Sequence, residues 1–556
     1  MTYVPTLLRS RRASAFALMA LVASGLPVAC GGGSDAPAPA PAPALTAAEA
    51  CAAIGTSSIA SSAISIPTTG ATISSATLQA ASGAGPTATG EYCKVLGAIK
   101  PIDRSAPPIL FQVNLPTTWN GKAFQHTGGG YDGSLVNGTG GAPSTGGLAT
   151  PLAKGYTTFG SDSGHPGNGF DASFGMNDEA LENYFGDQLR KTRDLAVALM
   201  QTRYAKAPTK TYIAGGSGGG REALYAADRW PDVYDGVIAY YPAWSLTSMI
   251  LNYGRISKAL AAPGAWPNPA KQALVASAVT GACDALDGAT DSIVSNLAAC
   301  HFDPVVLRCP GGADTGDTCL SDAQIAGTSS YAAALALPFP LANGTNSYPA
   351  YNVFTGAANL GGPLPAAGTA APVTPSTFQM PFAFYIYEPF VRYWVTRDAD
   401  YDSLNFNATS TAYFVQRLQY ISSRLDVRTD LSAFKAHGGK VIVVHGQADS
   451  IIPAKTTEDL LSKLTTSMGA TTVSSFLKFY EVPGFSHGFG AFSPSWDSVS
   501  ALEAWVEQGT APVNQIATDT NPSAGGRTRP LCEYPTWPKY SGTGDINVAA
   551  SYICSP

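Results

Sequence analysis

A serine inside a run of glycines is the first feature of this sequence that could do chemistry. Ser217 lies in "TKTYIAGGSGGGREAL", residues 209–224. The apolar residues before it predict a short buried strand, and the pattern after it predicts a helix. A G-x-S-x-G turn between strand and helix is typical of a nucleophile elbow, where glycines let neighbouring backbone approach closely. A flexible Gly/Ser linker is the alternative, but a linker would not be flanked by a buried strand and a helix.

A serine hydroxyl is a weak nucleophile and needs a general base. In α/β-hydrolases the nucleophile is followed along the chain by the acid and then by the histidine. The segment "KVIVVHGQAD" predicts a strand followed by a turn that carries Asp449. Of the six histidines, only His487 in "VPGFSHGFG" comes later. Ser217, Asp449 and His487 are therefore predicted to form a catalytic triad, and a solvated loop histidine is the alternative for His487.

The tetrahedral intermediate of acyl transfer needs N–H donors for its oxyanion. The N–H of Gly218, directly after the serine and at a helix N-terminus, is one predicted donor. The second is expected from "QHTGGGYDG", a glycine-rich segment after an early strand, with Gly129 or Gly130 as the donor.

A group of carboxylates forms a second chemical pattern. In "CDALDGATDSI", Asp284, Asp287 and Asp291 converge on a turn at Gly288. Carboxylates this close repel one another unless a hard cation such as Ca²⁺ lies between them. A surface Asp/Gly turn without metal is the alternative. An ion here is expected to order the chain and to take no part in the reaction.

The segments that carry these residues alternate between strand and helix patterns. Strands are expected over "ILFQVNLP", "KAFQHTGGG", "YTTFGSD", "KTYIAGG", "GVIAYYPA", "GKVIVVHG" and "FLKFYEVPG". Helical periodicity occurs over residues 179–205, 220–235, 456–469 and 498–509. This alternation predicts an α/β fold with a parallel sheet. Residues 50–95 are rich in Ser, Thr and Ala.

The alternation stops near Trp244. Residues 245–430 have an irregular pattern rich in Pro, Gly and aromatic residues, and they contain four cysteines. One sheet interrupted by an inserted segment explains this better than three domains. We therefore predict an α/β-hydrolase core over residues 49–244 and 431–556. Residues 245–430, called the insertion below, are predicted to form a lid domain between the nucleophile and acid strands.

The N-terminus has the pattern of an export signal. Arginines within residues 9–12 precede an apolar run that ends before Cys30, so residues 1–29 are predicted to be a signal peptide. Cys30 stands where a bacterial lipoprotein carries its lipidated cysteine, and residues 30–48 predict a Pro/Ala-rich tether. Ordinary cleavage that removes Cys30 is the alternative. The protein is expected to be periplasmic or anchored to the outer membrane, or secreted, with a lipid as its only membrane contact.

Cysteine usage supports export. Nine cysteines occur, and setting Cys30 aside leaves an even number, as expected in an oxidising compartment. Eight cysteines allow on the order of a hundred pairings, and pairing in chain order is the simplest hypothesis. It joins Cys51 with Cys93, Cys283 with Cys300, Cys309 with Cys319, and Cys532 with Cys554. A zinc site is the rival interpretation, disfavoured because no CxxC occurs and His301 is the only nearby imidazole.

The bulk composition excludes some classes of function. Charged residues make up only 13% of the 556 residues, and the net charge is −6. No basic run follows the N-terminus, which argues against nucleic-acid binding. Hydrophobic residues make up 45%, enough for a large core. No later segment is long and apolar enough for a membrane span.

With these residues placed, the chain resembles the tannase and feruloyl esterase family of α/β-hydrolases, which includes the mono(hydroxyethyl) terephthalate hydrolases. The likeness runs from about Cys51 to Cys554 and rests on the order and spacing of eight segments. They are "WNGKAFQHTGGGYDG", "GYTTFGSDSGH", "GGSGGGREAL", "CDALDGATDSIVSN", "VRYWVTRDADYDSLNF", "VVHGQADSIIP", "GFSHGFG" and "RPLCEYPTWPKYSGTGDINVAASYIC".

The resemblance implies a lid between the serine and aspartate strands, which agrees with the insertion. It also implies a structural Ca²⁺ at the three aspartates, completed by the backbone carbonyls of Ala289 and Ile293, and no organic cofactor. The sequence departs from the family at two places. Family members usually carry one cysteine just before the nucleophile and another just after the histidine, joined as a disulfide behind the triad. Gly216 and Gly488 stand at those positions, so this chain lacks that brace.

We expect an exported serine esterase that hydrolyses aromatic carboxylic esters, phenolic or terephthalic, through an acyl-enzyme. The aromatic residues from Phe382 to Trp394 are candidates for walls that stack on an acyl ring, and lid core is the alternative for them. A short aliphatic or hydroxyalkanoate ester is the second substrate hypothesis. A non-catalytic surface lipoprotein is the third hypothesis, which the complete triad disfavours.

Overall fold

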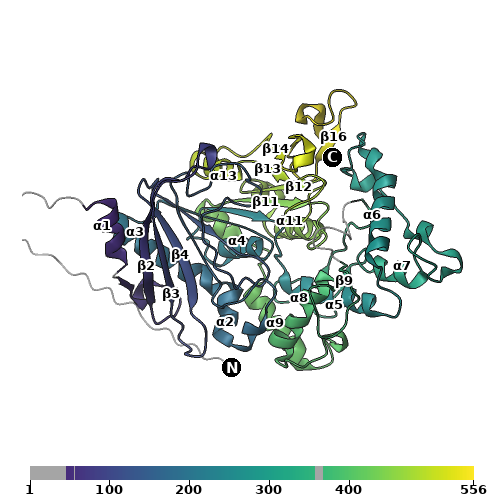
Figure 1. Cartoon of the computed structure of the whole chain (residues 1–556), viewed down its shortest axis with the longest axis horizontal. Helices are drawn as coiled ribbons and strands as arrows, with labels where there is room; N and C mark the ends of the chain where they lie inside the picture. The colour runs from purple at the N-terminus through teal and green to yellow at the C-terminus, as the bar shows by residue number, and fades with distance from the viewer. Residues whose placement is uncertain (1–44, 56, 357–366) are drawn as a thin grey trace, which may run out of the picture. The chain divides into compact units, whose positions relative to one another are not determined.

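A mixed sheet of ten strands forms the centre of the computed structural model, which describes residues 45–55, 57–356 and 367–556 (Figure 1). In chain order, these strands are β1 (Ser58–Ile59), β2 (Ala71–Gln79), β3 (Tyr92–Ile99), β4 (Ile109–Pro116), β5 (Lys122–His126), β6 (Thr157–Ser161), β7 (Lys210–Gly216), β8 (Gly236–Tyr240), β11 (Lys440–Gly446) and β12 (Leu477–Val482). Their order across the sheet is β1-β2-β3-β4-β6-β5-β7-β8-β11-β12.

Seven further strands form small sheets. They are β9 (Leu335–Ala336), β10 (Ser347–Tyr348), β13 (Pro494–Ser495), β14 (Ile516–Asp519), β15 (Thr528–Pro530), β16 (Trp537–Tyr540) and β17 (Tyr552–Ser555). The α-helices are α1 (Ala47–Ile54), α2 (Asp178–Glu182), α3 (Gln188–Tyr204), α4 (Gly218–Arg229), α5 (Leu246–Ala261), α6 (Pro269–Cys283), α7 (Asp322–Ser329), α8 (Phe382–Pro389), α9 (Ala412–Leu425), α10 (Ser432–His437), α11 (Lys455–Met468), α12 (Ala470–Ser474) and α13 (Ser498–Gln508).

The predicted α/β fold is confirmed, but the sheet is only partly parallel. Strands β6, β5, β7, β8, β11 and β12 pair in parallel, as the alternating pattern predicts. Strands β1 to β4 pair antiparallel, and β4 joins the parallel part through an antiparallel contact with β6. The prediction missed β2, whose segment is rich in Ser, Thr and Ala, and it missed β3, although alternate residues of β3 are buried. The signal peptide, Cys30 and most of the tether lie outside the described residues.

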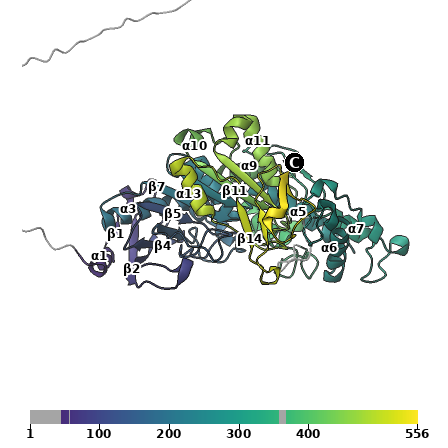
Figure 2. The same cartoon turned by 90° about the horizontal axis from the view of Figure 1, so that it is seen from above.

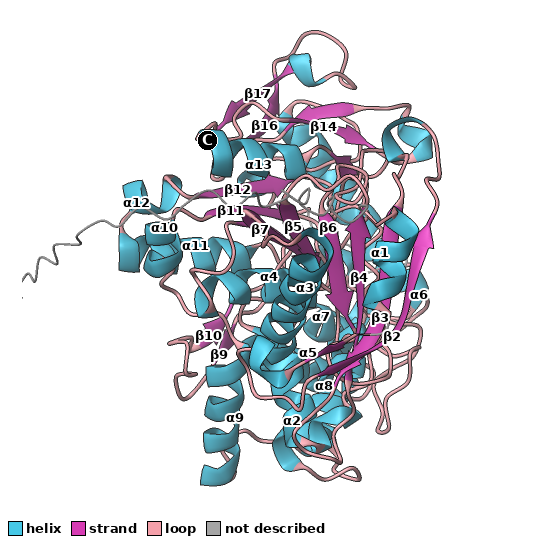
Figure 3. Cartoon of the chain, turned by 90° about the vertical axis from the view of Figure 1, so that its left-hand side faces the viewer, coloured by secondary structure: helices cyan, strands magenta, loops and turns pink. Residues whose placement is uncertain are grey.

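Helices cover both faces of the parallel part of the sheet (Figure 3). Alternate residues of a strand point to opposite faces. In β8, Val237 and Ala239 belong to a cluster with residues of α4 and α11. Ile238 and Tyr240 belong to a separate cluster that includes residues of α13. The central strands are therefore buried on both sides, which explains their nearly continuous apolar sequences.

The helix predicted over residues 179–205 is interrupted by a π-helical turn at Asn183–Asp187, which separates α2 from α3. A Cβ atom on Gly186 would lie 2.1 Å from the Tyr225 ring, so glycine permits α4 to approach here. The helical spacing of apolar residues continues across the π-helical turn, so the sequence pattern does not reveal the interruption.

The insertion lies between β8 and β11, and it contains the helices α5 to α9 joined by long irregular segments. In Figures 1 and 2, helices α5, α6 and α7 lie on the side of the molecule opposite β2. The insertion and the core share one hydrophobic cluster. Within it, the Trp394 indole donates to the Ala172 carbonyl at 2.9 Å, and the Tyr131 hydroxyl donates to the Ile386 carbonyl at 2.8 Å. Residues 45–556 form one compact unit, so the insertion packs as part of the core.

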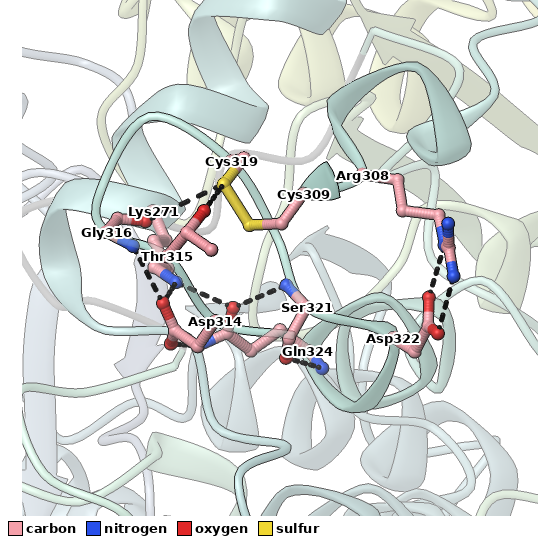
Figure 4. Close-up of a disulfide and its surroundings, with 10 residues drawn as sticks. All are labelled: Lys271, Arg308, Cys309, Asp314, Thr315, Gly316, Cys319, Ser321, Asp322 and Gln324. Carbon is pink, nitrogen blue, oxygen red and sulfur yellow. Dashed lines mark hydrogen bonds and ion pairs between the residues drawn. A yellow bond between two sulfur atoms is a disulfide. The ribbon is translucent and has the colours of Figure 1, made fainter. Parts of the chain in front are cut away.

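All four disulfides join the cysteines in chain order, which confirms the simplest pairing hypothesis and excludes the zinc interpretation. Figure 4 shows the pair Cys309–Cys319 and its surroundings. There the buried Lys271 ammonium donates to Asp314 at 2.7 Å and to Gln324 at 2.8 Å, which ties the disulfide loop to α6 and α7. Four disulfides are typical of proteins that fold in an oxidising compartment. None of the helices in the described ranges is long and apolar enough to cross a bilayer.

Candidate active site

Ser217 occupies the turn between the end of β7 and the start of α4. Its φ is 62° and its ψ is −124°, a conformation that costs a non-glycine residue about 1–3 kcal/mol. Its N–H donates to the Tyr240 carbonyl at 3.0 Å, and its carbonyl accepts the N–H groups of Arg221 at 3.0 Å and Ala243 at 3.2 Å. The turn therefore has the strained geometry of a nucleophile elbow, and the serine itself carries the strain.

The glycines around Ser217 make room for a neighbouring loop. A Cβ atom on Gly215 would lie 1.8 Å from the Thr127 hydroxyl oxygen, and one on Gly218 would lie 2.8 Å from the Gly130 carbonyl oxygen. The Thr127 hydroxyl lies 3.1 Å from two backbone carbonyls of the serine turn, those of Ala214 and Gly219. Close backbone approach, not left-handed φ, is thus the reason for glycine at these positions.

Asp449 and His487 lie on the loops after β11 and β12 and form a direct pair. The His487 Nδ1 lies 2.8 Å from one Asp449 carboxylate oxygen. The other oxygen accepts the N–H groups of Ile451 and Ile452, each at 2.8 Å. Burial alone would raise the pKa of Asp449, but the charge and hydrogen bond of His487 and a contribution from His445 hold that pKa below its usual range. The ionised carboxylate assigns the proton to Nδ1 and leaves Nε2 as the basic atom.

His445 is a second buried imidazole near the same carboxylate. Its Nε2 lies 2.8 Å from the Ile452 carbonyl oxygen and 3.5 Å from the Asp449 carboxylate, and its Nδ1 lies 2.8 Å from the Thr457 hydroxyl. The sequence prediction gave His445 no role. Its position four residues before Asp449, at the end of a strand, was the available signal.

The glycine-rich segment Gly128–Gly130, called the oxyanion loop below, lies against the start of α4. The N–H groups of Gly129 and Gly130 donate to no acceptor within the described part of the chain, and the N–H of Gly218 is in the first helical turn, where no intrahelical acceptor exists. The Tyr184 hydroxyl donates to the Gly130 carbonyl at 2.9 Å, and the Asp132 N–H donates to the Gly129 carbonyl at 2.9 Å. The structure thus brings the three predicted donors together beside the serine turn.

Ser217 and His487 line the same open cavity of about 410 Å³. The remaining lining residues come from the oxyanion loop and nearby segments: His126, Thr127, Gly128, Gly141, Pro143, Ala214, Gly215, Gly216 and Tyr241. Burial lowers the pKa of His126 to about 4, so this imidazole is neutral at neutral pH.

None of the residues that line this cavity belongs to the insertion. Phe384, Phe390 and Trp394 are fully buried in the cluster shared with the core. Because they are buried, these aromatic residues are better explained as part of the hydrophobic core of the lid than as a surface that packs against a substrate ring. Phe382, Tyr385 and other partly exposed aromatic residues of this segment pack at the edge of the same cluster or near it.

The three aspartates predicted to bind calcium lie in one loop after α6. Asp291 forms an ion pair with Arg529, and its N–H donates to Asp284 at 3.3 Å. Among the residues that the structure describes, no group of three His, Cys, Asp or Glu side chains is arranged to hold a metal ion.

Asp287, unlike Asp291, has no cationic partner in the described part of the chain. It is 4% exposed, and its two oxygens accept the N–H groups of Ala289 at 3.0 Å and Ser295 at 2.8 Å. No lysine or arginine in the described ranges forms an ion pair with it, and burial raises its pKa. A buried carboxylate of this kind suits a hard cation. Calcium here, with the carbonyls of Ala289 and Ile293, stays a prediction.

Comparisons with known proteins identify similar esterases. Residues 93–555 match the family model described as tannase and feruloyl esterase. An uncharacterized esterase of Agrobacterium fabrum is 41% identical, with 92% of this chain and 93% of the relative covered. A mono(2-hydroxyethyl) terephthalate hydrolase of Piscinibacter sakaiensis is 31% identical, with 84% and 85% covered. The crystal structure of feruloyl esterase B from Aspergillus oryzae is similar in fold, with a TM-score of 0.74 at 23% identity over 92% of this chain and 100% of that one.

Proposed function

Because this chain belongs to the tannase and feruloyl esterase family and is a carboxylic ester hydrolase, we propose that it cleaves its ester through a Ser217–His487–Asp449 triad and an acyl-enzyme. The observation that carries the proposal is the 2.8 Å contact between His487 and Asp449, in a cavity that His487 shares with Ser217.

The proposed reaction begins when the Ser217 hydroxyl oxygen attacks the ester carbonyl carbon and its proton passes to His487 Nε2. The Asp449 carboxylate stabilises the imidazolium and keeps the ring oriented. The N–H groups of Gly218 and of Gly129 or Gly130 stabilise the oxyanion. The intermediate then collapses, and the leaving alcohol takes the proton from His487. A water molecule, deprotonated by His487, attacks the acyl-enzyme, and the acid leaves as Ser217 is regenerated.

We propose an aromatic acyl group for the substrate. Relatives named as a terephthalate hydrolase and as feruloyl esterases support this class. The cavity wall supports it as well, because the neutral His126 offers a flat surface on which a ring can pack. The alternative is a short aliphatic or hydroxyalkanoate ester.

We also propose that the protein acts outside the cytoplasm. The four disulfides support export. Lipidation of Cys30, which lies outside the described residues, stays a prediction.

Ser217→Ala tests the nucleophile. Because the triad acts as a unit, we expect kcat to fall on the order of 10⁴-fold or more, with an unchanged melting temperature. Labelling by a fluorophosphonate should also disappear. Ser474→Ala, at an exposed serine, is the control and should keep full activity. More than a tenth of wild-type activity in Ser217→Ala would exclude this serine as the nucleophile.

A panel of esters tests the substrate class. Values of kcat/KM for methyl gallate, methyl ferulate and a terephthalate monoester are compared with those for p-nitrophenyl butyrate and palmitate. We expect at least one aromatic acyl ester to be preferred over both aliphatic esters, because a ring can pack against the flat cavity wall. A clear preference for palmitate would contradict the aromatic proposal.

A further inference from the structure

Tyr241 lies between the serine turn and the histidine loop, and nothing in the proposed reaction uses it. It follows β8 directly, and its N–H donates to the Val444 carbonyl of β11 at 2.7 Å. Its ring centroid lies 4.4 Å from that of His487, with the two planes tilted by 44°. On other sides the ring meets Phe485 at 5.8 Å and His445 at 6.5 Å, both between centroids.

The backbone of Tyr241 is strained. Its φ is +34°, in a region that a bulky aromatic residue rarely adopts. Such conformations persist only where the surrounding structure enforces them, and they concentrate at functional sites. At this position the unusual φ directs a large ring between two loops that carry proposed catalytic groups.

Both glycines at which this chain departs from its family face Tyr241. A Cβ atom on Gly216 would lie 2.7 Å from Cε2 of the Tyr241 ring and 3.0 Å from its hydroxyl oxygen. A Cβ atom on Gly488 would make an ordinary contact of 3.4 Å with the same hydroxyl oxygen, and the φ of +90° at this position favours glycine by itself. Gly216 directly precedes Ser217, and Gly488 directly follows His487. The ring therefore fills the space between the backbones of the two catalytic loops.

We infer that Tyr241 is a positioning residue for His487, and that Gly216 is a glycine because it must leave room for its ring. The inference rests on the proposed catalytic role of His487. The imidazole is held at one edge by Asp449 and on one face by Tyr241, so its Nε2 stays directed into the cavity that Ser217 lines. A hydrogen bond at Nδ1 alone fixes one ring atom and leaves rotation of the ring about that bond unrestrained.

The contribution is assigned to the ring and not to the hydroxyl group. The hydroxyl has no hydrogen-bond partner among the described residues. Burial and the negative charge of Asp449 raise the pKa of Tyr241, so it keeps its proton across the working pH range. Loss of the hydroxyl should therefore matter little, and loss of the ring should matter much.

Substitutions at Tyr241 provide the first test. Activity is measured with one hydrolysed ester and expressed per active serine, which is counted by burst titration. In Tyr241→Ala we expect kcat to fall roughly 10–100-fold with KM within about threefold, because a loosened imidazole misaligns proton transfer. Tyr241→Phe should stay within about threefold of wild type. The rate of fluorophosphonate labelling should fall in parallel with kcat, whereas partial unfolding would reduce the number of active serines and not the turnover of each.

A double-mutant cycle provides the second test. Gly216 ends β7 without a positive φ, so a methyl group there acts only through its contacts. We expect Gly216→Ala to lower kcat by about tenfold or more, because its methyl group displaces the ring. In the Tyr241→Ala background the same change should have little further effect, since the ring is gone. Tyr413→Ala, at a tyrosine of α9 that is 51% exposed, is the matched control and should not change kcat.

Turnover per active serine within twofold of wild type in Tyr241→Ala would overturn the inference. Equal losses in Tyr241→Phe and Tyr241→Ala would also overturn it, because the hydroxyl would then be the important group. If Tyr241→Ala does not fold, turnover per active serine is compared with wild type in Tyr241→Leu and Gly216→Ala instead. His487→Ala, measured in parallel, tests the triad separately: an active His487→Ala would refute the proposed function whatever Tyr241 does.

Discussion

Strain at two residues defines the proposed active site at the residue scale. Ser217 and Tyr241 both have positive φ values without being glycine, at 62° and 34°. Ser217 directly follows β7, and Tyr241 directly follows the neighbouring strand β8. A backbone hydrogen bond from the Ser217 N–H to the Tyr240 carbonyl joins the two turns. The nucleophile and the ring proposed to support the base are thus fixed by the same short stretch of paired backbone.

A buried carboxyl group directly after β6 predicts a pH dependence of stability. Asp162 is 2% exposed, and burial raises its pKa to about 7, with a further contribution from the charge of Asp132. The unfolded chain releases this proton near pH 4. Between about pH 4 and pH 7 the folded state therefore binds more protons, and the free energy of unfolding falls as the pH rises.

Asp162→Asn should remove this decline, because the amide does not titrate and its oxygen can still accept the N–H groups of Leu110 and Gly164. Relative to wild type, the variant should gain about 1–3 kcal/mol between pH 4 and pH 7 and no more above pH 7. Denaturant melts at several pH values measure this. Asp400→Asn, at an exposed aspartate, is the control. A constant difference from wild type at every pH would show that Asp162 does not titrate in this range.

At the element scale, the loop after α6 connects the insertion to the C-terminal part of the core. Asp291 in this loop pairs with Arg529 in β15, while Asp287 stays buried without a cation. The fold therefore pairs Asp291 with a cation and leaves Asp287 without one, and calcium at Asp287 stays a prediction. This division explains why the calcium prediction concerns stability and not the chemical step.

Chelation tests the calcium prediction. An ion bound only to the folded state stabilises it by roughly 2.7 kcal/mol at a hundred times its Kd. Excess EGTA should therefore lower the melting temperature while kcat changes little, and Asp287→Asn should abolish the response. Elemental analysis of the purified protein provides an independent measurement. A melting temperature unaffected by EGTA, together with no bound calcium, would refute the site.

At the scale of the whole molecule, the insertion and the core are joined by their shared hydrophobic cluster. Trp394 of the insertion packs at 5.1 Å from Tyr131 and 5.2 Å from Tyr184, both between ring centroids. Tyr131 directly follows the oxyanion loop, and the Tyr184 hydroxyl donates to it. The insertion therefore packs against residues that contact the oxyanion loop. None of the residues that line the cavity of Ser217 and His487 belongs to the insertion.

Calorimetry tests this shared core. Because insertion and core bury the same side chains, we expect a single unfolding transition for residues 45–556. Trp394→Ala should lower stability by about 3–5 kcal/mol and shift that transition as a whole. Tyr413→Ala is again the exposed control. Two separate transitions, or a shift confined to one of them, would show that the insertion unfolds independently.

The sequence alone determined the features that depend on neighbouring residues. The elbow around Ser217, the seven central strands, the disulfide pairing hypothesis and the chain order of serine, aspartate and histidine all follow from local patterns. Strands β2 and β3 and the helices of the insertion were missed. Among these helices, α6 and α7 have a weak apolar periodicity, whereas α5 and α9 have an amphipathic pattern that could have been recognised.

The tertiary structure alone decided which distant residues meet. The contact of Tyr241 with His487 joins positions 246 residues apart, and the pair Arg529–Asp291 joins positions separated by 238. No local pattern encodes such contacts, since they arise when strand order brings loops from different parts of the chain to one edge of the sheet. The same packing buried Trp394 and left Tyr241 beside the cavity. These two aromatic residues therefore have different environments, because burial depends on which surfaces the fold covers and not on aromatic character alone.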